Sequence, residues 1–342
     1  MIKKSKLKVC LYLQNPRLYR GSGIGQALKH QQKALELNSI DYTLDPHDGD
    51  YQVLHVNSQT PGSLLTIIKN KKIQKKIIIH AHATSEDFKK TFFFSNWVSP
   101  IIHWWFNIFY SYADLIICPT TYTRDLLKNN YSRLKNKKMV VISNGVDIEK
   151  WKPNKIRADK FIEDYKIKKP MIFSVGFAFP RKGIIDFIKI AKNISGAHFV
   201  WIGRYLKGLF RNKNLGREFK NSPKNFLLTG YVEDIMGAYS AGDIFFFPSY
   251  EENEGIVVLE AAAMGKPIIV RDIPVFRSYL KNKENCLMGK TNDDFVAHIN
   301  TLLSNQKLRE KLSKNARRLA ESKSLKLIGK NLKEVYLDIL GN

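Results

Sequence analysis

The chain has 342 residues, of which 44% are hydrophobic and 25% are charged. This composition excludes a disordered chain, and the length suits two domains of ordinary size. The 56 basic and 31 acidic residues leave a net charge of +25, which favours an anionic partner such as nucleic acid, an anionic membrane or a phosphate-bearing substrate. Residues 1–150 carry 22 basic and 11 acidic side chains, or +11, and the rest carries +14, which excludes a single basic tail.

The cysteines and the apolar segments indicate the compartment. Cys10, Cys118 and Cys286 are odd in number and far apart, without metal-site spacing, which is typical of a reduced cytoplasmic protein. The apolar run at residues 9–13 is too short for the core of a signal peptide. No uninterrupted apolar stretch reaches the about 18 residues of a spanning helix. We therefore expect a cytoplasmic protein whose membrane contact is peripheral.

The first half of the chain alternates short apolar runs with segments of helical periodicity. Strands are predicted at residues 9–13, 53–56, 77–80, 115–118 and 139–142, and helices at residues 25–38, 63–70, 99–112 and 123–130. The apolar runs lack a polar–apolar alternation, which is typical of parallel strands buried on both faces. Alternating strands and helices predict an α/β fold with a doubly wound sheet.

A glycine-rich loop follows the first predicted strand. Gly21, Gly23 and Gly25 match the dinucleotide fingerprint only in part, because Ala27 occupies the nearby helix position. Such a loop lets backbone amides approach a diphosphate or a sugar, so Gly23 and Gly25 are candidate donor-binding residues. The alternative is a flexible turn between strand and helix.

Histidines end the third predicted strand, at the sheet edge where open α/β sheets bind ligands. His80 and His82 should point to opposite sides of a strand, so they are poor joint metal ligands unless the strand has ended. We take His82 as the ligand-facing residue, with a hydrogen-bonded core histidine as the alternative. Asp48 and Asp50 are spaced like metal ligands, but they precede a strand where a plain turn explains them better. No metal site is predicted.

Lysines and aromatic residues gather between residues 69 and 112. The segment around Trp104 and Trp105 is apolar on every side of the predicted helix, which indicates either core packing or contact with lipid. The lysines that precede it are Lys71, Lys72, Lys75 and Lys76. Their charge would attract an anionic bilayer. Core packing of the helix remains the alternative.

The second half repeats the alternation after a turn-rich stretch at residues 144–153 that suits a hinge. Strands are predicted at residues 171–175, 198–203, 226–229, 244–247 and 267–270, and helices at residues 184–194, 235–241, 255–264 and 293–304. The expected domains are residues 1–150 and 151–322, and a terminal helix in residues 323–342 should return to the first domain. Two such sheets facing each other would form a cleft.

A basic pair follows the first strand of the second half. Arg181 and Lys182 lie at a strand-to-helix turn that ends with Gly183. A planar guanidinium beside a mobile ammonium can clamp a diphosphate. The pair would also stabilise the charge that a departing nucleoside diphosphate gains in the transition state. The alternative is a solvated pair in a chain rich in basic residues.

Acidic residues flank a glycine at the start of the helix predicted at residues 255–264. Glu252 and Glu254 precede Gly255, and Glu260 lies within the helix. The glycine lets a ligand approach the backbone, and amides of a first helical turn attract anions. A carboxylate such as that of Glu260 can accept hydrogen bonds from vicinal sugar hydroxyls, so the stretch indicates a nucleotide-sugar site. The alternative is a surface loop before an ordinary amphipathic helix.

The pattern Pro-Ser-x-x-Glu-x-x-Gly-x-x-x-x-Glu-Ala, at residues 248–261, resembles the acidic signature of family-4 retaining glycosyltransferases. Over nearly its whole length the chain is similar to bacterial glycolipid synthases that add a hexose to monoglucosyl-diacylglycerol. The other matching pieces are Ser22-Gly-Ile-Gly, Lys29-His-Gln-Gln-Lys-Ala-Leu-Glu, Ser85-Glu-Asp-Phe, Ser143-Asn-Gly-Val-Asp and Arg181-Lys-Gly-Ile. The chain departs from the wider family at Glu254, which replaces an apolar residue.

The resemblance implies two Rossmann-like domains in a B-type fold, retention of anomeric configuration, and no cofactor. It implies UDP-glucose or UDP-galactose as donor and a glycolipid acceptor at the inner face of the cell membrane. The catalytic residues would be His82 and Glu252 at the donor sugar and Arg181 and Lys182 at the diphosphate. Donor binding would involve Gly23, Gly25, Glu254, Gly255, Ile256, Val257 and, at the ribose, Glu260. The acceptor and the membrane would contact Glu86, Asp87, Lys71, Lys72, Lys75, Lys76, Trp104 and Trp105.

Other functions stay open at this point. The acceptor could instead be diacylglycerol itself, a polyprenyl-linked sugar or a polysaccharide, since all of these share the donor motifs. A nucleic-acid-binding protein would explain the charge alone. None of the usual recognition signatures of that class occurs in the sequence, so we expect no nucleic-acid partner.

Overall fold

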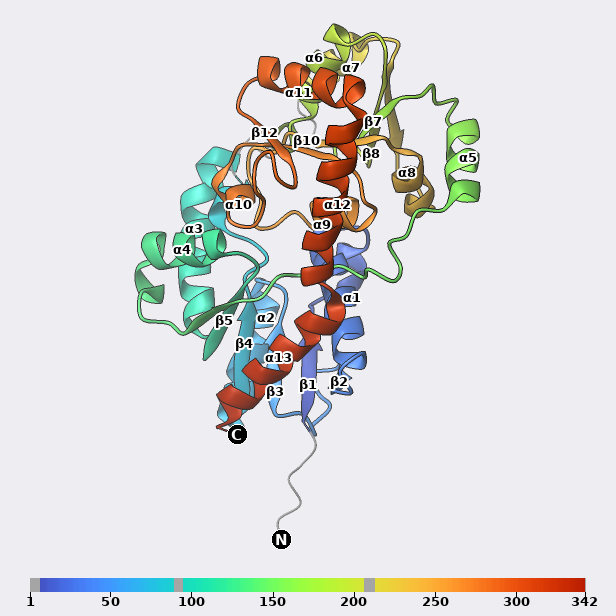
Figure 1. Cartoon of the computed structure of the whole chain (residues 1–342). Helices are drawn as coiled ribbons and strands as arrows, with labels where there is room; N and C mark the ends of the chain where they lie inside the picture. The colour runs from blue at the N-terminus through green and yellow to red at the C-terminus, as the bar shows by residue number, and fades with distance from the viewer. Residues whose placement is uncertain (1–6, 89–94, 206–212, 342) are drawn as a thin grey trace. The chain divides into compact units, whose positions relative to one another are not determined.

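The computed structural model describes residues 7–88, 95–205 and 213–341. Contacts divide the chain into two compact units. The first contains Met1–Ser85, Val98–Val146 and Lys323–Asn342, and the second contains Glu86–Trp97 and Asp147–Ser322. Among the described residues, each unit is built on one six-stranded sheet covered by helices (Figure 1). The predicted α/β architecture of two Rossmann-like units is confirmed.

The first unit has a parallel sheet in the order β2-β1-β3-β4-β5-β6. Its strands are β1 Lys8–Tyr12, β2 Asp41–Thr43, β3 Val53–Val56, β4 Lys76–His80, β5 Leu115–Cys118 and β6 Met139–Val141. Its helices are α1 Gly23–Glu36, α2 Pro61–Lys72, α3 Ser95–Ser111, α4 Thr121–Asn130 and α13 Leu325–Leu340, with short 3-10 turns at η1 Pro16–Tyr19, η2 Ser85–Phe88 and η3 Ser132–Leu134.

Three helices of this unit begin two residues before their predicted starts, and capping explains the difference. The side chains of Ser22, Thr60 and Thr120 each accept a hydrogen bond from the amide three residues further along. An N-cap of this kind satisfies one of the first amides of a helix and fixes where the helix begins. Hydrophobic periodicity starts only at the first buried side chain and therefore places the start too late.

The core of the first unit includes the chain's last helix. Leu325, Ile328, Leu332 and Tyr336 of α13 are buried together with residues of β1, β3, β4 and β5. The backbone joins this helix to the unit, because the amide of Leu325 donates to the carbonyl of Val146. Helix α13 packs against α1, so a segment from the end of the sequence completes the first unit (Figure 1).

The second unit has a parallel sheet in the order β12-β11-β10-β7-β8-β9. Its strands are β7 Met171–Val175, β8 His198–Ile202, β9 Phe226–Gly230, β10 Ile244–Phe247, β11 Ile268–Arg271 and β12 Leu287–Gly289. Its helices are α5 Lys155–Asp164, α6 Ile184–Asn193, α7 Lys213–Lys220, α8 Ile235–Ala241, α9 Ile256–Ala263, α10 Pro274–Arg277, α11 Asn292–Ser304 and α12 Gln306–Ser322, with a 3-10 turn at η4 Pro180–Lys182.

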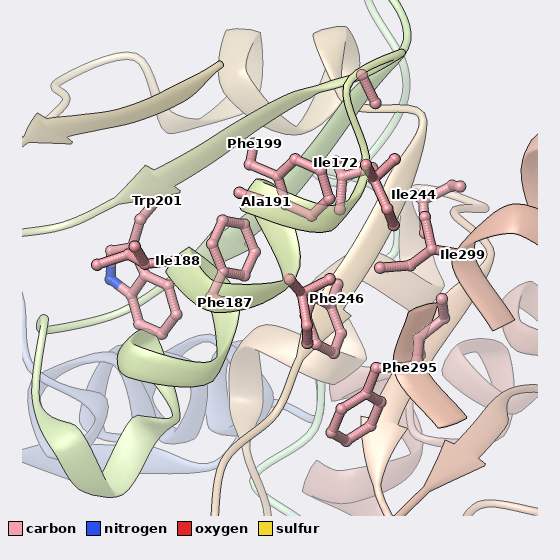
Figure 2. Packing of buried hydrophobic residues seen from close by; sticks show 14 of the residues in the cluster. Ile172, Phe187, Ile188, Ala191, Phe199, Trp201, Ile244, Phe246, Phe295 and Ile299 are labelled. Atoms are coloured by element: carbon pink, nitrogen blue, oxygen red, sulfur yellow. The ribbon is translucent and has the colours of Figure 1, made fainter. Parts of the chain in front are cut away.

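Aromatic packing fixes helix α6 on this sheet (Figure 2). The ring of Phe187 lies edge-on to Trp201 at 5.3 Å and stacks on Phe246 at 5.5 Å between centroids. Rings in such arrangements add about 0.5–1.5 kcal/mol per pair beyond their burial. This core supports β7 and β10, the two neighbouring strands whose carboxyl ends carry the candidate site.

Some elements of the second unit are absent from the sequence-based prediction. Strand β12 lies at the edge of the sheet and has three residues, so it gives little signal. Helix α12 is long but buries only Leu312, Ala316 and Ala320, and the two alanines hardly register as a hydrophobic stripe. Within the described part of the chain, no helix combines the length and apolar character needed to cross a membrane.

Candidate active site

Two loops meet at the carboxyl ends of β7 and β10 in the second unit. Strand β10 pairs with β7, and the amide of Tyr250 donates to the carbonyl of Arg181 at 2.8 Å. Gly183 adopts a φ of 80°, and a Cβ at this position would lie 2.2 Å from the carbonyl oxygen of Pro248. Only glycine allows this approach. The basic loop and the acidic loop predicted from separate motifs therefore form one structure.

Ion pairs and hydrogen bonds connect the two loops. The Nζ of Lys182 pairs with Oε1 of Glu252, which also accepts from the hydroxyl of Ser249 at 2.8 Å. Arg181 donates through Nη1 to the carbonyl of Glu251 at 2.5 Å. Burial lowers the pKa of Lys182, and the charge of Glu252 opposes that shift. These charges lie close together and largely away from water, where they act strongly on a bound anion.

A buried arginine at the end of β11 holds the acidic loop in place. Arg271 donates to Oδ2 of Asp186 at 2.5 Å and to the carbonyl of Pro248 at 3.0 Å, and its guanidinium lies 3.8 Å from the ring centre of Tyr250. The hydroxyl of Tyr250 donates to the same carboxylate at 2.6 Å. The sequence analysis missed these residues. Their signal was a charged residue within each of two apolar runs, residues 184–188 and 268–271.

Helix α9 begins directly after the acidic loop. Gly255, in a left-handed conformation, is its N-cap, and no side chain caps it. The first hydrogen bond inside the helix runs from the amide of Val258 to the carbonyl of Gly255, so the amides of Ile256 and Val257 precede it. Glu254 is buried, and its carbonyl accepts from the hydroxyl of Tyr279 at 2.5 Å. The start of α9 is therefore a helix N-terminus of the kind that attracts anions, and donor binding there stays a prediction.

Glu260 is buried in the second turn of α9. Its Oε2 accepts from the hydroxyl of Tyr239 at 2.9 Å. Burial raises the pKa of Glu260 to about 7, although the bond from Tyr239 lowers it. Glu260 therefore does not face solvent, as it would in the surface loop and amphipathic helix that the sequence left as the alternative. A buried carboxylate with one firm partner and a pKa near neutrality is typical of a functional site.

The structure places Asp87 beside the basic loop. Its carboxylate lies 3.7 Å from Nη1 of Arg181 and accepts from the side-chain amide of Asn253. The neighbouring Glu86 is half-buried. Both residues group with the second unit, and Asp87 lies beside Arg181, one of the cations predicted for the diphosphate.

In the first unit, His82 lies just beyond the carboxyl end of β4. The strand ends at His80, so the opposite orientation expected within a strand does not apply. The two rings stack with centroids 4.0 Å apart and planes 3° apart. Nε2 of His82 lies 2.7 Å from Oδ1 of Asn57. The direction of the His82 ring is therefore set by hydrogen bonding and stacking within this unit.

The glycine loop of the first unit forms the start of helix α1. Gly23 is the first residue of α1, and the amide of Gly25 donates to the hydroxyl of the N-cap Ser22 at 3.2 Å. A Cβ on Gly25 would lie 2.2 Å from the carbonyl oxygen of Tyr19, whereas one on Gly23 would meet no atom within 4 Å. Close packing therefore explains Gly25, and Gly23 has open space beside it.

The aromatic helix α3 is buried on one side and exposed on another. Phe106 and Phe109 lie in the core, whereas 61% of the Trp104 surface is exposed. Trp105 turns inward, and its Nε1 donates to the carbonyl of Gln59 at 2.8 Å. The position of Trp104 therefore fits the predicted contact with a membrane surface better than the position of Trp105 does. Phe92, Phe93 and Phe94, which belong to the aromatic residues gathered between residues 69 and 112, lie outside the described residues.

The predicted lysines differ in their surroundings. Lys71 forms an ion pair with Asp114 at 2.9 Å. Lys75 donates to the carbonyl of Gly49 at 2.9 Å and lies over the ring of Tyr51. Lys72 and Lys76 are exposed. Lys71 is exposed as well, since 38% of its side-chain surface stays open beside Asp114.

Asp48, which could have suggested a metal site, is an ion-pair partner. Its Oδ2 lies 2.9 Å from Nζ of Lys8, and its Oδ1 accepts from the amide of Asp50 at 3.5 Å. This is the turn that the sequence favoured. Across residues 7–88, 95–205 and 213–341, no group of three or more His, Cys, Asp or Glu side chains is arranged to hold a metal ion.

Sequence similarity identifies the family of the chain. Residues 29–150 match the model of Glycosyltransferase Family 4, and residues 155–319 match that of Glycosyl transferases group 1. The chain is 36% identical over 340 residues to the processive diacylglycerol alpha-glucosyltransferase of Acholeplasma laidlawii, covering 98% of this chain and 99% of that protein. It is 25% identical over 305 residues to the alpha-galactosylglucosyldiacylglycerol synthase of Streptococcus pneumoniae, covering 85% of this chain and 79% of that protein.

Solved structures share the fold. Anabaena HepE in complex with UDP and glucose superimposes with a TM-score of 0.76 at 17% identity, covering 96% of this chain and 99% of that one. The sucrose-phosphate synthase of Thermosynechococcus elongatus gives a TM-score of 0.75 at 15% identity, covering 98% of this chain and 100% of that one. These likenesses show a common two-domain architecture. Together with the sequence matches, they show that the chain belongs to the family-4 glycosyltransferases of B-type fold.

Proposed function

We propose that this glycosyltransferase moves glucose or galactose from a UDP-sugar to a membrane glycolipid, with monoglucosyl-diacylglycerol as the acceptor and a diglycosyl-diacylglycerol as the product. The observation that carries the proposal is the 36% identity over 98% of the chain to a protein named a processive diacylglycerol alpha-glucosyltransferase. A second relative, 25% identical over 85% of the chain, is named for a galactosylglucosyl lipid. The lipid class is common to both names, and the transferred sugar differs.

The charges of the second unit suit the donor. Arg181 and Lys182 would bind the diphosphate, and their charge would stabilise the leaving UDP as the bond between C1 of the sugar and the phosphate oxygen breaks. Glu260 would accept hydrogen bonds from the ribose hydroxyls, and Glu252 would contact the sugar. The amides of Ile256 and Val257 at the start of α9 would add a partial positive charge. Glu254 and Gly255 would lie beside the same donor.

The acceptor hydroxyl would form the new bond to C1 on the face that the diphosphate leaves. Its proton would pass to the departing phosphate oxygen, so no protein carboxylate need act as the base. This course retains the anomeric configuration, as the alpha product named for the relative requires from an alpha-linked UDP-sugar. His82, in the first unit, would hold the donor sugar near the reacting carbon, and Gly23 would let its backbone approach the ligand.

The first unit would bring the enzyme to its acceptor. Trp104 and Ile101 on α3 are 61% and 65% exposed, and Leu65 and Ile73 at α2 are 62% and 63% exposed. Exposed Lys72 and Lys76 lie close to Ile73 in the chain. Aromatic and aliphatic side chains beside lysines are typical of a surface that rests on an anionic bilayer. We therefore propose a cytoplasmic enzyme held peripherally at the inner face of the cell membrane.

A second acceptor class has support of its own. The chain is 29% identical over 258 residues to a Campylobacter jejuni transferase named for a diphospho-undecaprenol-linked sugar, covering 73% of this chain and 67% of that protein. A polyprenyl-linked acceptor would use the same donor residues. The two proposals differ only in the lipid that receives the sugar.

Product analysis separates these proposals. The purified enzyme is incubated with labelled UDP-glucose or UDP-galactose and, in separate reactions, with monoglucosyl-diacylglycerol, diacylglycerol or an undecaprenyl-diphosphate sugar. We expect label in a diglycosyl-diacylglycerol with one of the two donors. Label only in the polyprenyl lipid would select the second acceptor class, and label in diacylglycerol alone would make the enzyme the first transferase of the lipid. No labelled lipid in any reaction would contradict both proposals.

A further inference from the structure

A connected network of polar side chains lies buried in the first unit and ends at His82. Its other members come from helices and strands that are far apart in the sequence: Gln31 of α1, His55 of β3, Asn57, His80 of β4 and Tyr336 of α13. His55, Asn57 and Tyr336 are completely buried, and Gln31 and His80 are at most 4% exposed. Polar groups at this depth must satisfy one another, because water cannot reach them.

The first part of the network runs from the C-terminal helix to β4. The hydroxyl of Tyr336 lies 2.7 Å from Nδ1 of His55. Nε2 of His55 lies 3.3 Å from Nδ1 of His80, and the two rings are stacked with planes 4° apart. Tyr336 therefore reaches the strand that precedes His82 through a single intervening ring.

The second part runs from His80 to His82 through a pair of amides. Nε2 of Gln31 lies 3.1 Å from Nδ1 of His80 and 2.8 Å from Oδ1 of Asn57. Nδ2 of Asn57 in turn donates to Oε1 of Gln31 at 2.9 Å. The same Oδ1 of Asn57 lies 2.7 Å from Nε2 of His82. Two amides bonded to each other in both directions can reverse only together.

The three histidines are neutral rings in this setting. Burial lowers the pKa of His55 and of His82 to about 3, and burial also lowers the pKa of His80. A neutral imidazole has one N–H donor and one bare nitrogen acceptor. The histidines of the network can therefore differ only in their tautomer, that is, in which ring nitrogen carries the proton.

Only two proton arrangements leave every contact of the network with one donor and one acceptor. In the first, Tyr336 donates to His55, the Nε2–H of His55 and the Nε2–H of Gln31 donate to His80, and the Nε2–H of His82 donates to Asn57. In the second, both amides are reversed and every histidine carries its proton on Nδ1. His82 then accepts at Nε2 from the amide of Asn57.

The buried ends of the network favour the first arrangement. Among the described residues, the hydroxyl of Tyr336 has His55 as its hydrogen-bond partner and Nε2 of His80 has no partner. The first arrangement therefore leaves one unpaired donor, the Nε2–H of His80. The second leaves the hydroxyl proton of Tyr336 unpaired and, in addition, a bare Nε2 on His80. An extra unpaired buried group costs about 1–3 kcal/mol, so the Tyr336 hydroxyl selects the first arrangement.

We propose that Tyr336 is a positioning residue for His82: acting through His55, His80 and the Gln31–Asn57 amide pair, its hydroxyl fixes the tautomer of His82 in which Nε2 carries the proton. This inference rests on the proposed function, in which His82 contacts the donor sugar. In this tautomer Nδ1 is an acceptor nitrogen, as a hydrogen bond from a sugar hydroxyl requires, whereas in the other tautomer Nδ1 would be an N–H donor. The C-terminal helix thus contributes to the chemistry of a residue that lies more than 200 positions earlier in the sequence.

The first test reads the tautomer directly and needs no substrate. The enzyme is labelled with 15N-histidine, and the His82 signals are assigned by their loss in His82→Asn. Protonated and bare ring nitrogens resonate far apart, and we expect wild-type His82 to carry its proton on Nε2. Tyr336→Phe should produce a mixture of both tautomers. Unchanged signals in this variant would overturn the inference.

Tyr51→Phe is the matched control. Tyr51 is also buried in the first unit, and its hydroxyl oxygen lies 2.6 Å from Oδ1 of Asn70 and 2.8 Å from the carbonyl oxygen of Pro46. It has no place in the histidine network, so this variant should leave the His82 signals unchanged. An equal change in both variants would mean that any lost buried hydroxyl loosens the unit, which overturns the inference. His55→Leu is the second route: it removes both ring nitrogens and should give the same mixture as Tyr336→Phe.

The second test uses transfer kinetics. Tyr336→Phe should lower kcat by about tenfold, the usual consequence of losing one buried hydrogen bond, with little change in the KM of the donor. Tyr51→Phe should keep both constants. Full activity of His82→Asn would show that His82 has no role and would remove the functional half of the inference. A wild-type enzyme that labels no acceptor would refute the proposed function, whereas the tautomer measurement would still judge the network.

Discussion

In both units the residues considered for the site lie at the carboxyl ends of the strands. In the first unit these residues are neutral hydrogen-bonding groups, whereas in the second unit they are charged. In the first unit His82 forms a hydrogen bond with Asn57, and the rings of His80 and His82 are stacked. Arg181 and Lys182 instead form contacts with carboxylates and carbonyls. Both sheets consist of six parallel strands covered by helices, although their strand orders differ. The α/β architecture that the two units share therefore does not dictate this difference.

This difference agrees with the proposed roles, in which the second unit binds the diphosphate of the donor and His82 of the first unit contacts its sugar. Fixed cations stabilise a diphosphate, whose charge increases as it leaves. Neutral donors and acceptors suit sugar hydroxyls, which carry no charge and are recognised by the direction of each hydrogen bond. Substitutions in the second unit should therefore change how donor binding and transfer depend on charge and pH. Substitutions in the first unit should change the orientation of the bound sugar.

The largest effect is expected from the cations of the second unit. Arg181→Ala should lower transfer by about 100-fold, the usual cost of removing a preorganised group that stabilises transition-state charge. Glu260→Ala should have an effect of similar size, because it removes the proposed ribose contact. Initial rates with saturating acceptor measure both.

The matched control for the arginine variant is Arg157→Ala. Arg157 lies at the start of α5 in the same unit, is half-exposed and pairs with Asp234 at 3.4 Å. This variant removes the same charge from the unit at a different place and should keep near-normal rates. Turnover of Arg181→Ala or Glu260→Ala close to that of the wild type would contradict the donor-site assignment.

The next effect is a dependence of UDP affinity on pH. The pKa of Glu260 is raised by burial from its ordinary 4.5 to about 7, so the carboxylate that would accept from the ribose is protonated below neutrality. At a pH about 1.5 units below this pKa, UDP should bind roughly 30-fold more weakly than at alkaline pH, since each unit corresponds to a factor of ten. Titration calorimetry across the pH range measures this.

Glu260→Gln removes the titrating group and should give a nearly flat profile over the same range. Its effect on stability has a definite sign. Above pH 4.5 the unfolded chain releases this proton while the folded protein keeps it up to about pH 7, so ionisation favours unfolding as the pH rises through this window. The glutamine variant should therefore gain stability relative to the wild type as the pH rises from 4.5 to about 7. An unchanged pH dependence of UDP binding would contradict the assignment of Glu260.

Much of the fold and the charged half of the site could be predicted from sequence. Arg181, Glu252 and Gly255 stand in motifs beside strong apolar runs, and parallel strands bring their carboxyl ends together wherever the sheet forms. The network around His82 could not be predicted, because its members are spread over residues 31–336 and meet only through tertiary packing. Arg271 and Asp186 were missed for a related reason, since a single charge within an apolar run does not reveal its partner.

A smaller effect concerns membrane binding by the first unit. Lys72→Gln should weaken binding to anionic vesicles by about fivefold, because one lysine near the surface contributes about 1 kcal/mol. Lys314→Gln, on α12 of the second unit, makes the same change in net charge and should bind like the wild type; Lys314 is also exposed. Equal losses in both variants would show that net charge, and not this surface, governs binding. Vesicle sedimentation over a salt series measures both, and the contribution of Trp104 should persist at high salt.

The smallest expected effect is that of a chelator. In the second unit Arg181 and Lys182 already supply two positive charges beside the place proposed for the diphosphate. In the first unit the carboxylate of Asp48 is paired with Lys8 at 2.9 Å. A divalent ion would therefore duplicate charge that the side chains provide, and transfer should persist in excess EDTA. A loss of activity that returns when magnesium or manganese is added back would show that the cations of the second unit do not suffice, and that a metal ion supplies part of the positive charge at the diphosphate.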